Sequence, residues 1–233
     1  MGLDDIQIVM IIAIIIIGIL SILYYSNAFG DYLSIRENKW DKDPTFCILK
    51  PSDYKDYKPY GLSMGKMIAA VNIWKVELNH YTNSNEWNYT IKVFPTYNGL
   101  MGYDCDVTIE FVATNTGPFG TTECYVVAEA NRQYCDITIY TYEQPVNYII
   151  STITHETGHA LGLGHRLPWT KCDFAAVIPS KDIMMMSASK GQKITDDDLR
   201  ALIQIYGKDG FKEPNPVYGS PKFWITNKPL TCA

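Results

Sequence analysis

The chain lacks any run of basic residues. Lysine and arginine together number 20 against 25 aspartates and glutamates, which gives a formal net charge of −5. The basic residues form no stripe or arginine-rich cluster. Nucleic-acid-binding proteins carry such an electrostatic footprint. We therefore expect no nucleic acid among the partners.

The chain is also too short for several large domains. Its 233 residues, of which 47% are apolar and 19% charged, can bury one substantial core. A chain of this length forms one large domain or two small ones. We expect one domain, in a monomer.

One long segment lacks charge altogether. Residues 6–23, "IQIVMIIAIIIIGILSIL", contain no charged side chain and no polar face. As a helix they would span roughly 27 Å, close to the hydrocarbon thickness of a bilayer. The acidic start and the length of the run favour an uncleaved transmembrane anchor over a signal peptide, and we assign it to residues 1–28. Cleavage near Ala28, which would release a secreted protein, is the alternative.

Six cysteines lack the spacing of a metal site. They include no C-x-x-C pair, so a disulfide framework in an oxidising compartment is the better interpretation: Cys47, Cys105, Cys124, Cys135, Cys172 and Cys232. Two basic residues after the apolar run, Arg36 and Lys39, weakly favour the opposite orientation. We place the body of the protein outside the cytoplasm.

Two of these cysteines begin similar segments, "CDVTIE" and "CDITIY". If the two segments form neighbouring parallel strands, Cys105 and Cys135 come close in register. Among the fifteen connectivities that six cysteines allow, this pairing is the first choice.

The chain after the apolar run divides into three parts. Residues 29–44 are polar and rich in turn formers, and we expect a tether there. Residues 45–207 contain the folded signals: a short strand at 45–50, an amphipathic helix over 62–79 and β-rich segments between 87 and 142. Residues 208–233 lack periodicity but contain aromatic residues, so we expect a tail that packs on the domain.

Histidine is scarce, yet three of the four histidines lie in the eleven-residue segment "HETGHALGLGH", residues 155–165. The apolar spacing of the preceding residues predicts a helix that contains His155 and His159. These two side chains are one turn apart on the same face, so both imidazoles can reach one ion at about 2.0–2.1 Å.

The third histidine needs a turn in the chain. A continued helix would carry His165 roughly 9 Å along the axis, out of reach of the shared ion. Gly162 and Gly164 can adopt positive φ, so the helix can stop and the chain can turn back. Three imidazole ligands leave one position open for water, as in a catalytic zinc site. Glu156 is then placed to act as general base and acid.

The segment resembles the signature of the metzincin zinc metallopeptidases, H-E-x-x-H-x-x-G-x-x-H, at every fixed position. The family adds a Met-turn, and "DIMMMS", residues 182–187, is the candidate. By similarity, Met184 would lie beneath the zinc as a packing residue, with Met185 as the fallback. The chain is most similar to the matrixin subfamily, in which a capped helix follows the Met-turn; here Thr195 and Asp198 form the candidate capping box.

The resemblance implies an α+β catalytic domain. Its twisted, mostly parallel sheet has about five strands and an antiparallel edge strand. The sheet packs on a central helix and an active-site helix, and a C-terminal helix follows the Met-turn. A protein or peptide substrate would bind along the edge strand, which we assign to residues 123–129.

The function implied is a membrane-anchored, extracytoplasmic zinc endopeptidase. One catalytic Zn²⁺ is implied by His155, His159 and His165, with Glu156 as the catalytic residue, and structural calcium is left open. A surface binding module that keeps this fold without turnover is the alternative.

Overall fold

The computed structural model describes eight ranges of the chain: 33–35, 40–50, 61–95, 104–114, 119–127, 132–166, 181–185 and 191–212. The expected anchor at residues 6–23 lies outside these ranges, as do Cys172, Cys232 and the tail from residue 213 onward. Within the described ranges, no helix combines the length and apolarity needed to cross a membrane.

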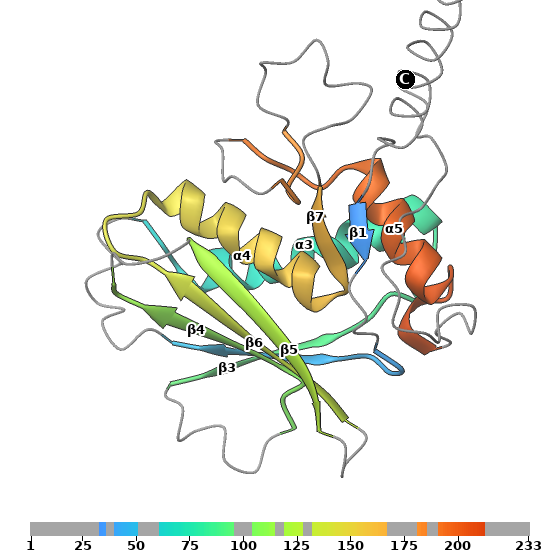
Figure 1. Ribbon diagram of the computed structural model, residues 1–233, viewed down its shortest axis with the longest axis horizontal. Helices are drawn as coiled ribbons and strands as arrows, with labels where there is room; N and C mark the ends of the chain where they lie inside the picture. The colour runs from blue at the N-terminus through green and yellow to red at the C-terminus, as the bar shows by residue number, and fades with distance from the viewer. Residues whose placement is uncertain are drawn as a thin grey trace, which may run out of the picture.

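A five-stranded sheet forms the base of the fold (Figure 1). Its strand order is β3-β2-β4-β6-β5, and every neighbouring pair is parallel except β5 with β6. The strands are β2 (Thr45–Leu49), β3 (Thr90–Phe94), β4 (Val107–Val112), β5 (Gly120–Val127) and β6 (Arg132–Tyr140). This confirms the expected mostly parallel sheet with an antiparallel edge. The edge strand begins three residues earlier than the predicted range 123–129.

In the part of the chain that the structure describes, three α-helices complete the α+β architecture: α3 (Met64–Thr82), α4 (Val146–Ala160) and α5 (Asp196–Tyr206). In Figure 1, α4 and α3 lie over one face of the sheet, and α5 lies beyond the C-terminal end of α4. A short 3-10 helix, η4 (Gly210–Lys212), follows α5.

The central helix α3 follows its sequence pattern closely. Ser63 caps its N-terminus by accepting a hydrogen bond from the backbone N–H of Lys66, and Asn83 ends it in the left-handed conformation with φ 50°. Its buried side chains repeat at helical spacing, as predicted: Met67, Ala70, Val71, Trp74 and Leu78. They join the main core between the helices and the sheet.

Two disulfides differ from the predicted pairing. The structure joins Cys47 to Cys105 and Cys124 to Cys135, so the expected Cys105–Cys135 bridge is wrong. The two segments do form parallel neighbours, but the residue opposite Cys135 is Val107. Cys105 precedes that strand and packs with Cys47 in a separate small cluster. Cys124 stands directly opposite Cys135 on the antiparallel edge strand, which places the two residues in bonding range.

A second sheet of two strands lies beside the end of α4 (Figure 1). Strand β1 (Leu33–Ile35) pairs antiparallel with β7 (Leu163–Arg166), which contains the third histidine of the signature. The residues of β1 come from the segment expected to be a tether. Part of that segment therefore belongs to the folded domain.

The C-terminal helix has the predicted cap. The Thr195 side chain accepts a hydrogen bond from the Asp198 backbone N–H, and Asp198 Oδ2 accepts one from the Thr195 backbone N–H at 2.8 Å, so the two residues form a capping box. Gly207 ends the helix with φ 86°. Beyond it, Phe211 is fully buried against the rings of Trp87 and Tyr206, so the first described residues of the tail do pack on the domain.

Candidate metal centre

Helix α4 presents the first two histidines of the site. It is anchored to α3 by two hydrogen bonds: Trp74 Nε1 donates to the Thr154 carbonyl at 2.8 Å, and Thr154 Oγ1 donates to the Ala70 carbonyl at 3.2 Å. Both bonds are buried, so the helix is fixed immediately before His155. His155 and His159 then project from one face, with ring centroids 4.5 Å apart.

The chain reverses after His159, and one glycine makes the turn. Helix α4 ends at Ala160, Leu161 keeps right-handed helical angles, and Gly162 has φ 106°. A side chain at this φ would be strained, which is the reason for glycine there. Gly164 lies within β7 and is not among the glycines with positive φ, so the predicted freedom is needed at Gly162 alone.

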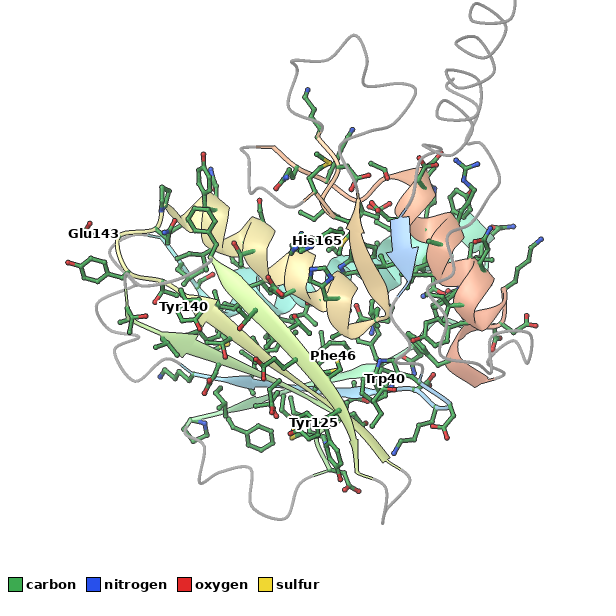
Figure 2. The ribbon with its side chains drawn as sticks, viewed as in Figure 1. Trp40, Phe46, Tyr125, Tyr140, Glu143 and His165 are labelled. Atoms are coloured by element: carbon green, nitrogen blue, oxygen red, sulfur yellow. A yellow bond between two sulfur atoms is a disulfide. The ribbon has the colours of Figure 1, made fainter. Side chains whose placement is uncertain are left out.

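The turn brings His165 against the other two histidines. Its Nε2 lies 3.2 Å from Nε2 of His155 and 3.2 Å from Nε2 of His159. In Figure 2 the labelled His165 side chain lies against the C-terminal part of α4. The structure therefore brings the three predicted ligands together. His159 is buried, and the other two are partly exposed.

In His155 and His159, the hydrogen bond made by Nδ1 determines that Nε2 is the nitrogen that faces the centre. His155 Nδ1 lies 2.6 Å from the Ile183 carbonyl oxygen, and His159 Nδ1 lies 2.7 Å from the Leu163 carbonyl oxygen. A carbonyl can only accept, so each Nδ1 must carry the proton. In a neutral ring Nε2 then offers a lone pair to the centre. Backbone partners of this kind orient histidine ligands in metal sites.

The spacing of the three Nε2 atoms fits one ion. In their neutral forms, His155 and His159 each direct an Nε2 lone pair toward His165 Nε2, which lies 3.2 Å from both. Ligands about 2.0 Å from a tetrahedral ion are separated by roughly 3.3 Å along each edge. The three histidines could therefore hold one metal ion through three corners of a tetrahedron.

Glu156 lies beside this centre in a buried position. Its side chain is 4% exposed, and its Oε2 accepts a hydrogen bond from Thr122 Oγ1 of β5 at 2.6 Å. A Cβ built on Gly120 of the same strand would lie 2.8 Å from Glu156 Cγ and 2.9 Å from Oε1. The start of the edge strand therefore leaves room for the glutamate and orients its carboxylate.

Met184 lies in the segment that follows the third histidine. It is fully buried, and a Cβ built on Gly158 of α4 would lie 2.6 Å from its Sδ. Its backbone N–H donates to Asp182 Oδ1 at 2.7 Å, and Thr195 Oγ1 lies 3.1 Å from Asp182 Oδ2. Asp182 thus ties the segment to the cap of α5. Ile183, the residue before Met184, supplies the carbonyl that orients His155.

Sequence reasoning did not find two residues near the centre, Thr122 and Trp40. Thr122 lies just before the predicted edge strand. Trp40 lies in the expected tether, although it is 2% exposed in the structure. A tryptophan within an otherwise polar segment was the available signal for packing.

Comparison with known proteins adds no family assignment. No protein-family model matches the chain, and no curated protein matches it. The description of the centre therefore rests on its own geometry.

Proposed function

We propose that the chain is a zinc-dependent endopeptidase. The observation that carries the proposal is the convergence of three Nε2 atoms, with separations of 3.2 Å from His165 to each of the other two ligands. Neutral imidazole ligands in tetrahedral arrangement suit zinc, and a site with three protein ligands keeps one position for reaction. When bound, zinc polarises a carbonyl group and lowers the pKa of water.

Glu156 has the position of a general base in this reaction. It follows His155 directly in the chain, and its carboxylate is held by Thr122 Oγ1 at 2.6 Å. We infer that it takes a proton from the attacking water and passes it to the leaving amine. A buried carboxylate that accepts a hydrogen bond keeps one orientation, which general base catalysis requires.

Strand β5 supplies a surface for a peptide substrate. It pairs with β6 on one side, and the described residues provide no strand on its other side. Its first residues contact Glu156, so a peptide that adds to this edge by main-chain hydrogen bonds would pass the candidate centre. This supports a protein or peptide as substrate.

The two remaining parts of the proposal concern family and location. The signature at residues 155–165 and the placement of Met184 against α4 support the resemblance to metzincins, most closely the matrixins. Two disulfides support an oxidising environment. Together with the apolar segment at residues 6–23, they support an anchored protein whose catalytic domain lies outside the cytoplasm.

The test compares the full chain with the variant Glu156→Gln. Glutamine keeps the shape of the side chain but cannot take a proton, so hydrolysis of an unstructured protein should fall by about 1000-fold, within the 10²–10⁴-fold range of general base catalysis. Zinc should stay at one equivalent. Glu77→Gln on α3 is the matched control and should keep full activity.

The alternative is a binding module with the same fold and no turnover. One equivalent of zinc without hydrolysis that depends on Glu156, in an assay with a mixed peptide library, would favour that module. Absence of zinc from the purified full chain, after incubation with the metal, would refute both.

A further inference from the structure

The C-terminal end of α4 is held by two side chains from distant parts of the sequence. Trp40 Nε1 donates a hydrogen bond to the Ala160 carbonyl at 2.8 Å. Tyr206 Oη donates to the Leu161 carbonyl at 2.9 Å, and it accepts from the Trp40 backbone N–H at 3.3 Å. All three bonds are buried. They connect the segment before β2 and the end of α5 to the residues directly after His159.

These bonds use groups that the helix itself leaves without partners. The last carbonyls of an α-helix have no partner within the helix, so an outside donor decides where the backbone goes next. Here the two carbonyls lie immediately before Gly162, the residue at which the chain turns toward His165. The two donors therefore fix the direction in which the turn begins.

The other end of the turn is held by the N-terminal segment as well. Strand β1 pairs with β7, with Leu33 opposite Arg166 and Ile35 opposite Leu163. Only four residues separate β1 from Trp40 in the sequence. In Figure 2 Trp40 lies between the sheet and α5, and Figure 1 shows β1 beside β7. One short segment thus contacts the chain on both sides of the reversal.

The position of His165 relative to the other ligands depends on this reversal. His155 and His159 are fixed to each other by α4, whereas His165 belongs to β7. Within the turn itself, the Gly162 backbone N–H donates to the His159 carbonyl at 3.0 Å, and His159 Nδ1 donates to the Leu163 carbonyl at 2.7 Å. Other parts of the chain add the pairing of β1 with β7 and the bonds from Trp40 and Tyr206.

We propose that Trp40, Tyr206 and β1 form a clamp that holds His165 in its metal-binding position. Trp40 and Tyr206 are positioning residues, because their side chains donate to backbone carbonyls that lie between the ligands His159 and His165. The proposal rests on the proposed zinc site. It makes residues 33–35 and Trp40 a structural part of the centre.

The chain offers a close control for Tyr206. Tyr89 is also buried, its Oη donates to the Val71 carbonyl at 2.6 Å, and it accepts from the Lys75 backbone N–H at 3.1 Å. Tyr206→Phe and Tyr89→Phe therefore each remove one donor and one acceptor from buried backbone groups. Of these two tyrosines, only Tyr206 makes its hydrogen bonds next to the metal ligands.

A second pair of variants tests the tryptophan. Trp40→Phe keeps an aromatic ring but removes the donor to Ala160. Trp87 is the control, because it is fully buried, packs on the Tyr206 ring at 6.0 Å, and its indole N–H has no hydrogen-bond partner within the described residues. Trp87→Phe therefore disturbs the packing around Tyr206 without removing a hydrogen bond of the clamp.

The zinc dissociation constant of each full-length variant, measured by chelator competition, is the main readout. Loss of one buried hydrogen bond can lower the population of the binding-competent turn up to about tenfold, and the apparent constant rises by the same factor. We expect about tenfold weaker binding for Tyr206→Phe and for Trp40→Phe. Both controls should stay within about twofold of the wild type.

Two further readouts separate positioning from general loss of stability. The visible absorption spectrum of the cobalt-substituted protein should change for the two clamp variants and not for the controls. Amide hydrogen exchange of residues 161–165 in the metal-free protein should become faster for the same two variants.

The outcomes distinguish this proposal from the proposed function. If the wild type binds zinc and Tyr206→Phe matches Tyr89→Phe in affinity and cobalt spectrum, the clamp is wrong and the zinc site stands. Equal weakening in all four variants would also overturn the clamp, because packing alone would explain it. A wild type that binds no zinc would overturn both proposals.

Discussion

Replacing Gly158 with alanine should disturb the candidate metal centre through the buried side chains that pack against α4. Gly158 lies in α4 between the two helical ligands, and an added Cβ would lie 2.6 Å from Met184 Sδ and 2.8 Å from Trp74 Cζ2. Both neighbours are fully buried. Ordinary contacts between such atoms are about 3.5–4.0 Å, so at least one of the two side chains must move by about 1 Å.

The size of the effect follows from two opposing terms. Overpacking a closed core costs about 1–3 kcal/mol. Alanine in place of glycine favours a helix interior by about 0.8–1 kcal/mol. We expect a net loss of about 0–2 kcal/mol in the free energy of unfolding relative to the wild type, and a larger loss relative to a glycine-to-alanine change without the clash. Movement of Met184 would also shift the neighbouring Ile183 carbonyl, which lies 2.6 Å from His155 Nδ1, so zinc affinity should fall as well.

Denaturant unfolding of the full chain, with and without zinc, measures both effects. Gly65→Ala on α3 is the control, because the nearest atom to its added Cβ is Ser63 Oγ at 3.9 Å. The double variant Gly158→Ala/Met184→Ala should be destabilised by less than the sum of the single variants, since the new methyl group enters the space left by the methionine. Strict additivity, or a Gly158→Ala variant as stable as Gly65→Ala, would refute the packing described here.

Two further predictions concern the general base and the buried tyrosines. Thr122→Val should lower kcat about 10- to 100-fold at unchanged zinc content, because a hydrogen bond to a charged group contributes about 1.5–3 kcal/mol. Thr122→Ser should keep kcat near the wild-type value, and equal loss in both variants would contradict the role of the hydroxyl. Burial raises the pKa of Tyr89 and of Tyr206 above the ordinary value. Above about pH 10 the unfolded chain loses these protons first, so unfolding free energy should fall by about 1.4 kcal/mol per pH unit for each tyrosine. Denaturation between pH 9 and 11 should show a shallower fall for Tyr89→Phe, and an unchanged slope would contradict the burial.

Local sequence patterns predicted most of the helices and strands and all three histidine ligands. The apolar repeat of α3 and the capping box at Thr195 were predictable because each depends on residues three or four positions apart. The three histidine ligands were predictable for the same reason, since a turn of helix and one reversal determine their spacing. The strand segments were predictable from composition, and their mostly parallel order came from the resemblance.

Long-range register could not be predicted. The pairing of Cys105 with Cys47 depends on which face of the sheet the chain reaches before β4, and the sequence similarity of two strands says nothing about that. The bond from Thr122 to Glu156 depends on how far β5 extends toward α4. Trp40 joins the end of a helix 120 positions away in the sequence, so no local pattern could reveal its partner.

The most direct test of the metal centre is X-ray absorption spectroscopy of the zinc-loaded full chain at the zinc edge. The geometry predicts three nitrogen scatterers of imidazole type and one oxygen at about 2.0–2.1 Å, with one imidazole lost in His165→Ala. A sulfur scatterer near 2.3 Å, or a spectrum that His165→Ala leaves unchanged, would contradict a single ion bound by His155, His159 and His165.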